Sequence, residues 1–152
     1  MANPSNLSWI WRGIFSSMPN MPGCILHVSG EDFQVDAFLA NSNLRPYRVH
    51  HRGEIGQRSR PFIDSGLSLD VSSADGSSIK MQIVDAIAFL CTHEAELERL
   101  RSFPGVTSLL LDFGYYRRDV AAQIEYLPPE LLLRAGTLGI GIKLSLYAVS
   151  DL

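Results

Sequence analysis

Five segments of the chain alternate apolar and polar residues, which is the pattern of β-strands that bury one face. They cover residues 24–29, 67–72, 108–115, 120–126 and 140–148. In the second segment, every polar position (Ser68, Asp70 and Ser72) would face away from the core. Because only one face of each strand is apolar, we expect a largely antiparallel or mixed sheet that is covered on one side.

Three other segments repeat their apolar residues at helical spacing. The first covers residues 33–39 and follows Asp32, which we expect to cap it. The second is one long helix over residues 83–100, after a turn at 75–78 that supplies a serine cap. The third covers residues 131–138 and follows a Pro-Pro-Glu sequence, which is typical of a helix start.

These elements predict an α+β two-layer sandwich, a ferredoxin-like variant with an inserted helix, whose helices cover one face of the sheet. The fourth strand, 120–126, would pair with the third through a hairpin turn at 117–119. Residues 44–61 follow neither period, and we call this segment the arm. The prediction is one domain over residues 24–152, preceded by an extension over residues 1–23 that is rich in Ser, Asn, Pro and Gly.

Several short motifs, in this order, resemble a family of bacterial domains catalogued as domain of unknown function 4279. They are Leu26-His27-Val28-Ser29-Gly30-Glu31-Asp32-Phe33, Arg52-Gly53-Glu54, Ser65-Gly66-Leu67-Ser68-Leu69, Leu127-Pro128-Pro129-Glu130-Leu131, Leu138-Gly139-Ile140 and Leu146-Tyr147. The similarity spans about residues 24–147. The sequence departs from the family pattern at Leu67, where tryptophan is expected, and at Tyr47 with its basic neighbours. The resemblance supports the fold, and it implies no reaction because the family has no assigned activity.

Composition narrows the class of protein without naming a reaction. Of the 152 residues, 46% are hydrophobic and 19% are charged, which suits one globular domain with its own core. No zinc, P-loop or dinucleotide-binding spacing is present, so we expect no cofactor and no metal. The chain shows no apolar run of membrane length and no basic leader before its first aromatic residues, so we expect a cytoplasmic protein. Both cysteines, Cys24 and Cys91, are expected to be reduced core residues.

The arm has an unusual charge. Residues 45–60 contain five arginines against one glutamate, in a chain whose net charge is -3. The candidate residues for binding a partner or an anion are Arg45, Arg48, His50, His51, Arg52, Arg58 and Arg60. Arginine binds carboxylate and phosphate groups through paired hydrogen bonds, which favours an anionic partner. The alternative is that these arginines pair with the acidic remainder of the chain and hold the arm in place.

The polar face of the predicted sheet is the second candidate site. His27, Asp70, Asp112, Lys143 and Tyr147 come from four strands and all point away from the predicted core. Together they could bind a ligand or act as a weak acid–base site, or the face could simply be solvated. Their proximity depends on the strand order, which the sequence leaves open.

Two smaller features were weighed for chemistry. His50 and His51 are adjacent on an extended arm and would point to opposite sides, so we expect solvated histidines and not a metal site. Glu94 falls on the apolar stripe of the long helix, where it pairs with an arginine of the arm, lies exposed, or acts as a catalytic carboxylate with a perturbed pKa. No Ser/His/Asp or Cys/His arrangement is supported by the spacing, so no catalytic residue is assigned.

The leading hypothesis is therefore a non-catalytic interaction module that binds an acidic protein, or a second copy of itself as a homodimer, through the arm. An immunity- or antitoxin-like role is one version of this hypothesis, based on size and acidity alone. The alternative is a binder of, or an enzyme acting on, a small anionic ligand, held in a cleft between the arm and His27 and Tyr147. Nucleic-acid binding is less favoured because the chain is acidic and the arm has few aromatic residues.

Overall fold

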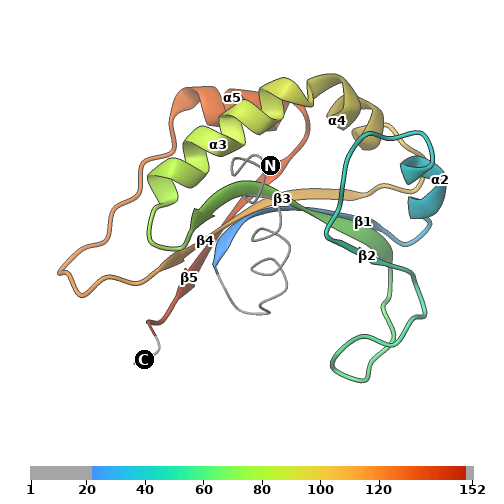
Figure 1. Ribbon diagram of the computed structural model, residues 1–152, viewed down its shortest axis with the longest axis horizontal. Coiled ribbons are helices and arrows are strands. Elements are labelled where there is room, and N and C mark those ends of the chain that lie inside the picture. The colour runs from blue at the N-terminus through green and yellow to red at the C-terminus, as the bar shows by residue number, and fades with distance from the viewer. Residues whose placement is uncertain (1–21, 150–152) are drawn as a thin grey trace, which may run out of the picture.

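A five-stranded mixed sheet with helices over one of its faces makes up the computed structural model, which describes residues 22–149 (Figure 1). The strands are β1 (Gly23–Gly30), β2 (Arg48–His50), β3 (Ser65–Asp75), β4 (Ser108–Tyr116) and β5 (Gly141–Tyr147). The helices are α2 (Val35–Leu39), α3 (Ile79–Thr92), α4 (Glu94–Arg101) and α5 (Pro129–Thr137). The expected α+β two-layer sandwich is confirmed.

The strand order is β2-β3-β1-β4-β5. Both neighbours of β1 run antiparallel to it, so β3 and β4 are parallel to each other on its two sides. The chain passes from β3 to β4 over the sheet through α3 and α4, a split β-α-β unit of the kind found in ferredoxin-like layers. A second pass through α5 brings β5 parallel to β4 at the edge of the sheet.

The core lies between the inner face of the sheet and the helix layer. Alternate residues of the central strands, such as Leu26, Leu111 and Phe113, are fully buried. The helices close this layer with Leu90, Leu97 and Leu131, among others. The period-2 pattern of the strands therefore predicted the buried face correctly, because successive side chains of a strand point to opposite faces.

The fourth predicted strand is wrong. Residues 117–128 form no strand, and Val120, Ile124 and Tyr126 are exposed. Both sides of β4 are already occupied by β1 and β5, so this segment has no free neighbour with which to pair. It forms a loop instead, in which Arg118 forms an ion pair with Glu125 at 3.0 Å.

The predicted long helix is in fact two helices. His93 separates α3 from α4 and has non-helical backbone angles (φ -106°, ψ 16°). After this bend, Leu97 and Leu100 are fully buried. Glu94 begins α4 and is exposed, which agrees with the alternative that it lies outside the core. The expectation that Cys91 lies in the core is wrong, because Cys91 is exposed.

The helix caps are predicted correctly at one of two positions. Ser78 caps α3 by accepting a hydrogen bond from the Met81 amide at 3.4 Å. Asp32 does not cap α2, because that helix begins later, after Gln34, which makes no side-chain cap. Asp32 lies instead in the preceding turn, which the bond from the Phe33 amide to the Gly30 carbonyl closes.

Three expectations concern the ends of the chain. Residues 1–21 of the predicted extension lie outside the described residues, whereas Pro22 is buried and Gly23 already begins β1. The last strand is present, but Leu144 and Leu146 on its apolar face are exposed because β5 is an edge strand. Among residues 22–149, no helix has both the length and the apolar character needed to cross a membrane.

Candidate functional site

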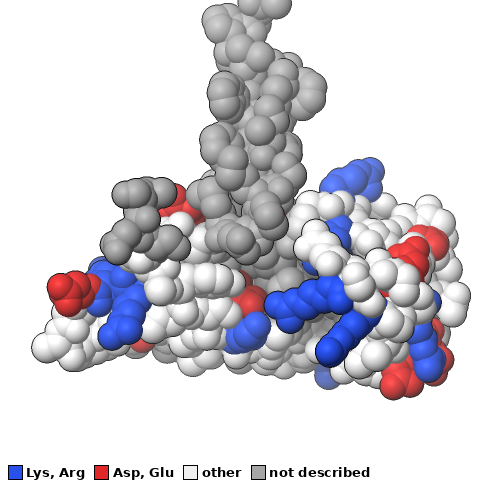
Figure 2. Space-filling model, turned by 90° about the horizontal axis from the view of Figure 1, so that it is seen from below, with Lys and Arg blue, Asp and Glu red and all other residues white. Residues whose placement is uncertain are grey.

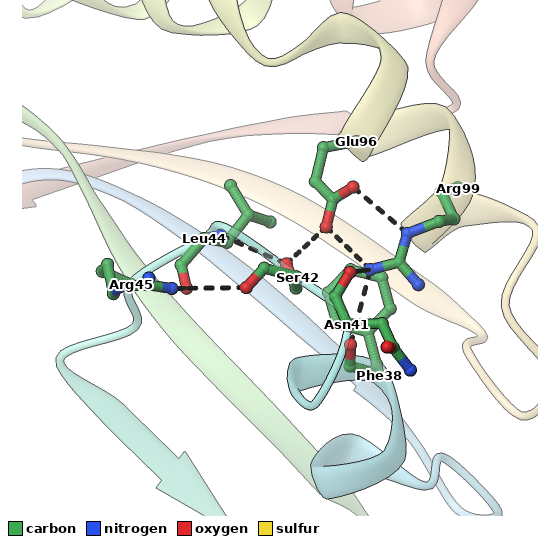
Figure 3. Close-up of polar contacts among 7 residues, drawn as sticks. All are labelled: Phe38, Asn41, Ser42, Leu44, Arg45, Glu96 and Arg99. Atoms are coloured by element: carbon green, nitrogen blue, oxygen red, sulfur yellow. Dashed lines mark hydrogen bonds and ion pairs between the residues drawn. The ribbon is translucent and has the colours of Figure 1, made fainter.

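The arm begins at an anchor between α2 and α4 (Figure 3). Glu96 accepts hydrogen bonds from the Ser42 hydroxyl and from the Arg99 guanidinium, the latter at 2.7 Å. Arg99 also donates to the Asn41 carbonyl at 3.0 Å and lies over the Phe38 ring at 4.1 Å. The pKa of Glu96 is lowered, first by the hydrogen bond from Arg99. This anchor fixes the point from which the arm leaves the body.

The arm contains a short strand and a projecting hairpin, neither of which the sequence pattern predicted. Strand β2 pairs with β3 at the edge of the sheet. Residues 51–62, which we call the arm hairpin, fold back through an isolated bridge between Ile55 and Pro61, and this loop extends away from the sheet in Figure 1. The backbone of Gly53 adopts a positive φ of 86° here, which glycine accommodates without steric cost.

His51 joins the hairpin to α2. Its Nε2 lies 2.8 Å from Asp36 Oδ2 and its Nδ1 lies 2.9 Å from Glu54 Oε1. These hydrogen bonds raise the pKa of His51, with the bond to Asp36 the larger cause. An imidazole that faces a carboxylate at each nitrogen donates to both only in its protonated form. The two carboxylates therefore favour a charged His51 at the base of the hairpin.

The arginines of the arm are all exposed, and most of them have no acidic partner in the described part of the chain. Arg52 is the exception, with Nη1 at 3.8 Å from Asp32 and 4.0 Å from Glu31. Arg45 donates to the carbonyls of Ser42 and Leu44 instead of to a carboxylate. The expectation that these arginines are neutralised by the acidic remainder therefore holds only for Arg52.

The remaining arginines differ in position. Arg48 lies in β2, with its guanidinium 5.7 Å from the centre of the Phe62 ring. Arg58 and Arg60 flank Ser59, which has a positive φ of 55°, at the tip of the arm hairpin. Within residues 22–149 no carboxylate lies within ion-pair distance of these three guanidinium groups.

The arm also supplies side chains to the outer face, by which we mean the sheet face opposite the helices. Arg48 pairs with Ser68 across the strands, and Ser68 pairs with His27, so these three side chains form one row. His27 Nδ1 lies 3.0 Å from the Ser68 hydroxyl. Figure 2 shows this face, with Lys and Arg gathered toward the end of the molecule that carries the arm. The arm and the outer face thus form one continuous surface.

A second polar row crosses the sheet beside the first. Asp70, Ile25, Asp112 and Lys143 occupy paired positions on β3, β1, β4 and β5. Asp112 accepts a hydrogen bond from Ser145 at 2.6 Å and forms an ion pair with Lys143 at 3.0 Å. The strand order therefore brings four of the five predicted outer-face residues together: His27, Asp70, Asp112 and Lys143.

Tyr147 does not join them. It pairs with Tyr116 at the far end of β5, four residues beyond Lys143. Tyr47 of the arm, which the sequence did not suggest as a site residue, supplies a phenol at the end of the outer face beside the arm. Partial burial and the charge of Asp70 raise the pKa of Tyr47, against a hydrogen bond with Ser68.

The outer face favours the neutral form of His27. Partial burial lowers its pKa most, and the positive charges of Lys143 and Arg48 lower it further, against the opposing charge of Asp112. The contact between a neutral imidazole and the buried Ser68 hydroxyl was not expected from the sequence, because the two residues lie 41 positions apart. In the described chain, no group of three His, Cys, Asp or Glu side chains is placed to hold a metal ion.

No family model, no curated protein and no solved structure matches this chain. The resemblance to domain of unknown function 4279 therefore stays a prediction.

Proposed function

We propose that this protein is an interaction module that binds an acidic segment of a partner protein through the arm and the adjoining end of the outer face. The observation that supports this proposal most directly is the set of exposed arginines without an acidic partner among the described residues. Arg58 and Arg60 lie at the tip of a projecting hairpin, where a partner's carboxylates can reach them. Arg48 extends the same positive surface onto the sheet.

The surroundings of the aromatic rings in and beside the arm favour a protein partner over nucleic acid. Binding of single-stranded nucleic acid relies on exposed aromatic rings that stack on bases. The Phe62 ring already lies 4.5 Å from the His50 ring and faces Arg48 at 5.7 Å. Tyr47 is the one exposed ring in the arm, so the arm offers several guanidinium groups for carboxylates and a single ring for bases.

A small anionic ligand is the second candidate, and one observation favours it. One cation of the arm, Arg48, lies in the same row as His27 and Ser68, so a small carboxylate or phosphate could contact all three side chains. Asp70 and Asp112 offset much of the positive charge on that face. For this reason we place the acidic protein first.

The test compares the affinity of the full chain for three probes of different classes: a fluorescent glutamate-rich peptide, a single-stranded oligonucleotide of equal charge, and inorganic phosphate. We expect the peptide to bind, with an affinity that falls as salt is added. The double variant Arg58→Glu/Arg60→Glu should lose about tenfold or more in affinity, because each tenfold step needs only about 1.4 kcal/mol.

A matched control separates the position of the charge from its amount. Arg101→Glu/Arg134→Glu makes the same change in net charge on α4 and α5, outside the arm. We expect this control to bind the peptide like the wild type. Equal losses in both double variants, or binding of the oligonucleotide alone, would overturn the proposal. Binding of phosphate alone would favour the small-ligand alternative.

A further inference from the structure

A groove lies at the end of the sheet opposite the arm. Its volume is about 440 Å³, within the range of pockets that hold small ligands, and it is lined by the start of α3, the end of β4 and the loop after β4. Tyr116, Ile124 and Val149 contribute apolar surface to it, and Ile124 is 78% exposed. Val149 in the same lining is 61% exposed, and several exposed aliphatic side chains in one place indicate surface that a partner could cover.

The groove also carries cations. Lys80, Arg117 and Arg118 line it, and Glu125 is the only carboxylate in its lining. Glu125 is already paired with Arg118 at 3.0 Å. An occupant must therefore offer apolar surface together with groups that accept a cation, and the face of an indole ring meets both needs.

The chain itself enters the fold beside this groove. Pro22 is buried next to Gly76, which lines the groove; a Cβ added to Gly76 would lie 2.8 Å from Pro22 and 3.1 Å from the Tyr116 ring. Pro22, with which the described part of the chain begins, therefore lies at the wall of the groove. Thirteen positions separate Trp9 from Pro22, so the far end of residues 9–15 lies at most roughly 45 Å from Pro22, and every residue of the segment can reach the groove.

Residues 9–15 have the composition that the groove requires. Trp9, Ile10, Trp11, Ile14 and Phe15 fall within seven positions, and Arg12 is the one charged residue among positions 9–15. Both tryptophans of the chain are in this segment. We propose that residues 9–15 of the same chain dock in the groove between α3, β4 and the 117–125 loop, with indole rings against Ile124 and the groove's cations.

The two tryptophans make this proposal directly measurable, because the emission of the full chain reports on this segment alone. If the segment is docked, Trp emission is blue-shifted relative to the urea-unfolded chain, and acrylamide quenches it several-fold less. Ile124→Asp places a charge in the groove and should restore the quenching of the unfolded chain. The matched control is Ile63→Asp, because Ile63 is 79% exposed and lies in the segment after the arm, outside the groove.

Hydrogen exchange supplies a second readout that does not depend on Ile124. In the full-length Trp9→Ala/Trp11→Ala variant, the amides of residues 76–80 and 115–118 should exchange several-fold faster, while those of the central strands stay unchanged. Wild-type tryptophans as accessible as in urea would overturn the proposal. Protection of the tryptophans from acrylamide that disappears on dilution would also overturn it, because it would place the segment against a second copy of the chain. Protection that appears only with lipid vesicles would overturn it as well.

Discussion

Gly30 ends β1 where the backbone of another turn comes into direct contact with it. A Cβ added at Gly30 would lie 1.7 Å from the carbonyl oxygen of Gly105. Gly105 in turn has a positive φ of 86° and lies against the backbone of Asp32. These two glycines allow the end of β1 and the turn before β4 to approach each other closely.

The first prediction follows from this contact. Gly30→Ala should lower the free energy of unfolding by about 1–3 kcal/mol, because an overpacked site forces the backbone to shift. Gly136→Ala is the control, since no atom lies within 4 Å of an added Cβ and the residue is helical. That control should stabilise the protein by up to about 1 kcal/mol in urea unfolding. A Gly30→Ala variant as stable as the wild type would contradict the contact.

The second prediction concerns His27, whose pKa is lowered by burial. The folded state holds the imidazole neutral more firmly than the unfolded state does. Its contribution to stability is therefore fully present above the unfolded pKa of about 6.5 and is lost as the pH falls through the lower folded pKa. Urea unfolding on both sides of pH 6.5 should show this loss in the wild type and less of it in His27→Gln. An equal pH dependence in both proteins would exclude His27 as the cause.

At the scale of elements, polar side chains attach the arm to the helices at two points, in addition to the pairing of β2 with β3 and the ion pairs of His50 and Arg52. The first point is the anchor of Ser42, Glu96 and Arg99, and the second is the bridge from His51 to Asp36. Between them β2 adds only three residues to the sheet edge. The position of the arm hairpin relative to α2 therefore depends on His51 to a degree that a longer strand would not allow.

The third prediction tests this bridge by its pH dependence. Hydrogen bonds to Asp36 and Glu54 raise the pKa of His51, so its contribution is fully present below the unfolded value of 6.5 and is lost as the pH rises through the higher folded pKa. In an NMR titration of the four histidines, the His51 signal should titrate above 6.5 and the His27 signal below it.

The control for the bridge is Asp36→Asn, which removes the larger of the two causes. In that variant the His51 pKa should fall toward its ordinary value, and the amides of residues 51–62 should exchange faster at neutral pH. An unchanged His51 pKa in Asp36→Asn would show that the contact does not form in solution.

At the scale of the whole molecule, the sheet has one buried face and one polar face. Neighbouring residues of a single strand therefore belong to different environments. Leu111 is fully buried in the core, whereas Leu110 on the same strand is turned to the outer face and is only partly buried. Chemistry on the outer face and stability in the core can for this reason be changed separately.

The fourth prediction uses these two leucines. Leu111→Ala should cost about 2–5 kcal/mol of unfolding free energy, because it leaves a cavity in the core. Leu110→Ala should cost about 1 kcal/mol or less, in line with the smaller apolar area that it removes from contact. Both values come from urea unfolding monitored by circular dichroism. Equal costs for the two variants would mean that the outer face is covered as completely as the core.

The sequence by itself determined the class of fold and most of its elements. Four of the five alternating segments are strands, and the apolar positions of β1, β3 and β4 form the buried face, because burial on one side imposes a period of two on the residues themselves. The sequence also revealed the arm, because its positive charge and its lack of a helical or strand periodicity are properties of the segment alone and do not depend on what it packs against. Residues 120–126 have the alternating pattern of a strand but form none, because β1 and β5 already occupy both sides of β4.

Only the tertiary structure decided which residues come together. The strand order placed His27 beside Ser68, joined Asp112 to Lys143 and left Tyr147 at the far end of β5. It also showed which arginines are paired with a carboxylate, a property that depends on distances between segments far apart in sequence. Side-chain periodicity is a local consequence of backbone geometry, whereas pairing between strands is settled by the packing of the whole chain, so the sequence predicts the first and leaves the second open.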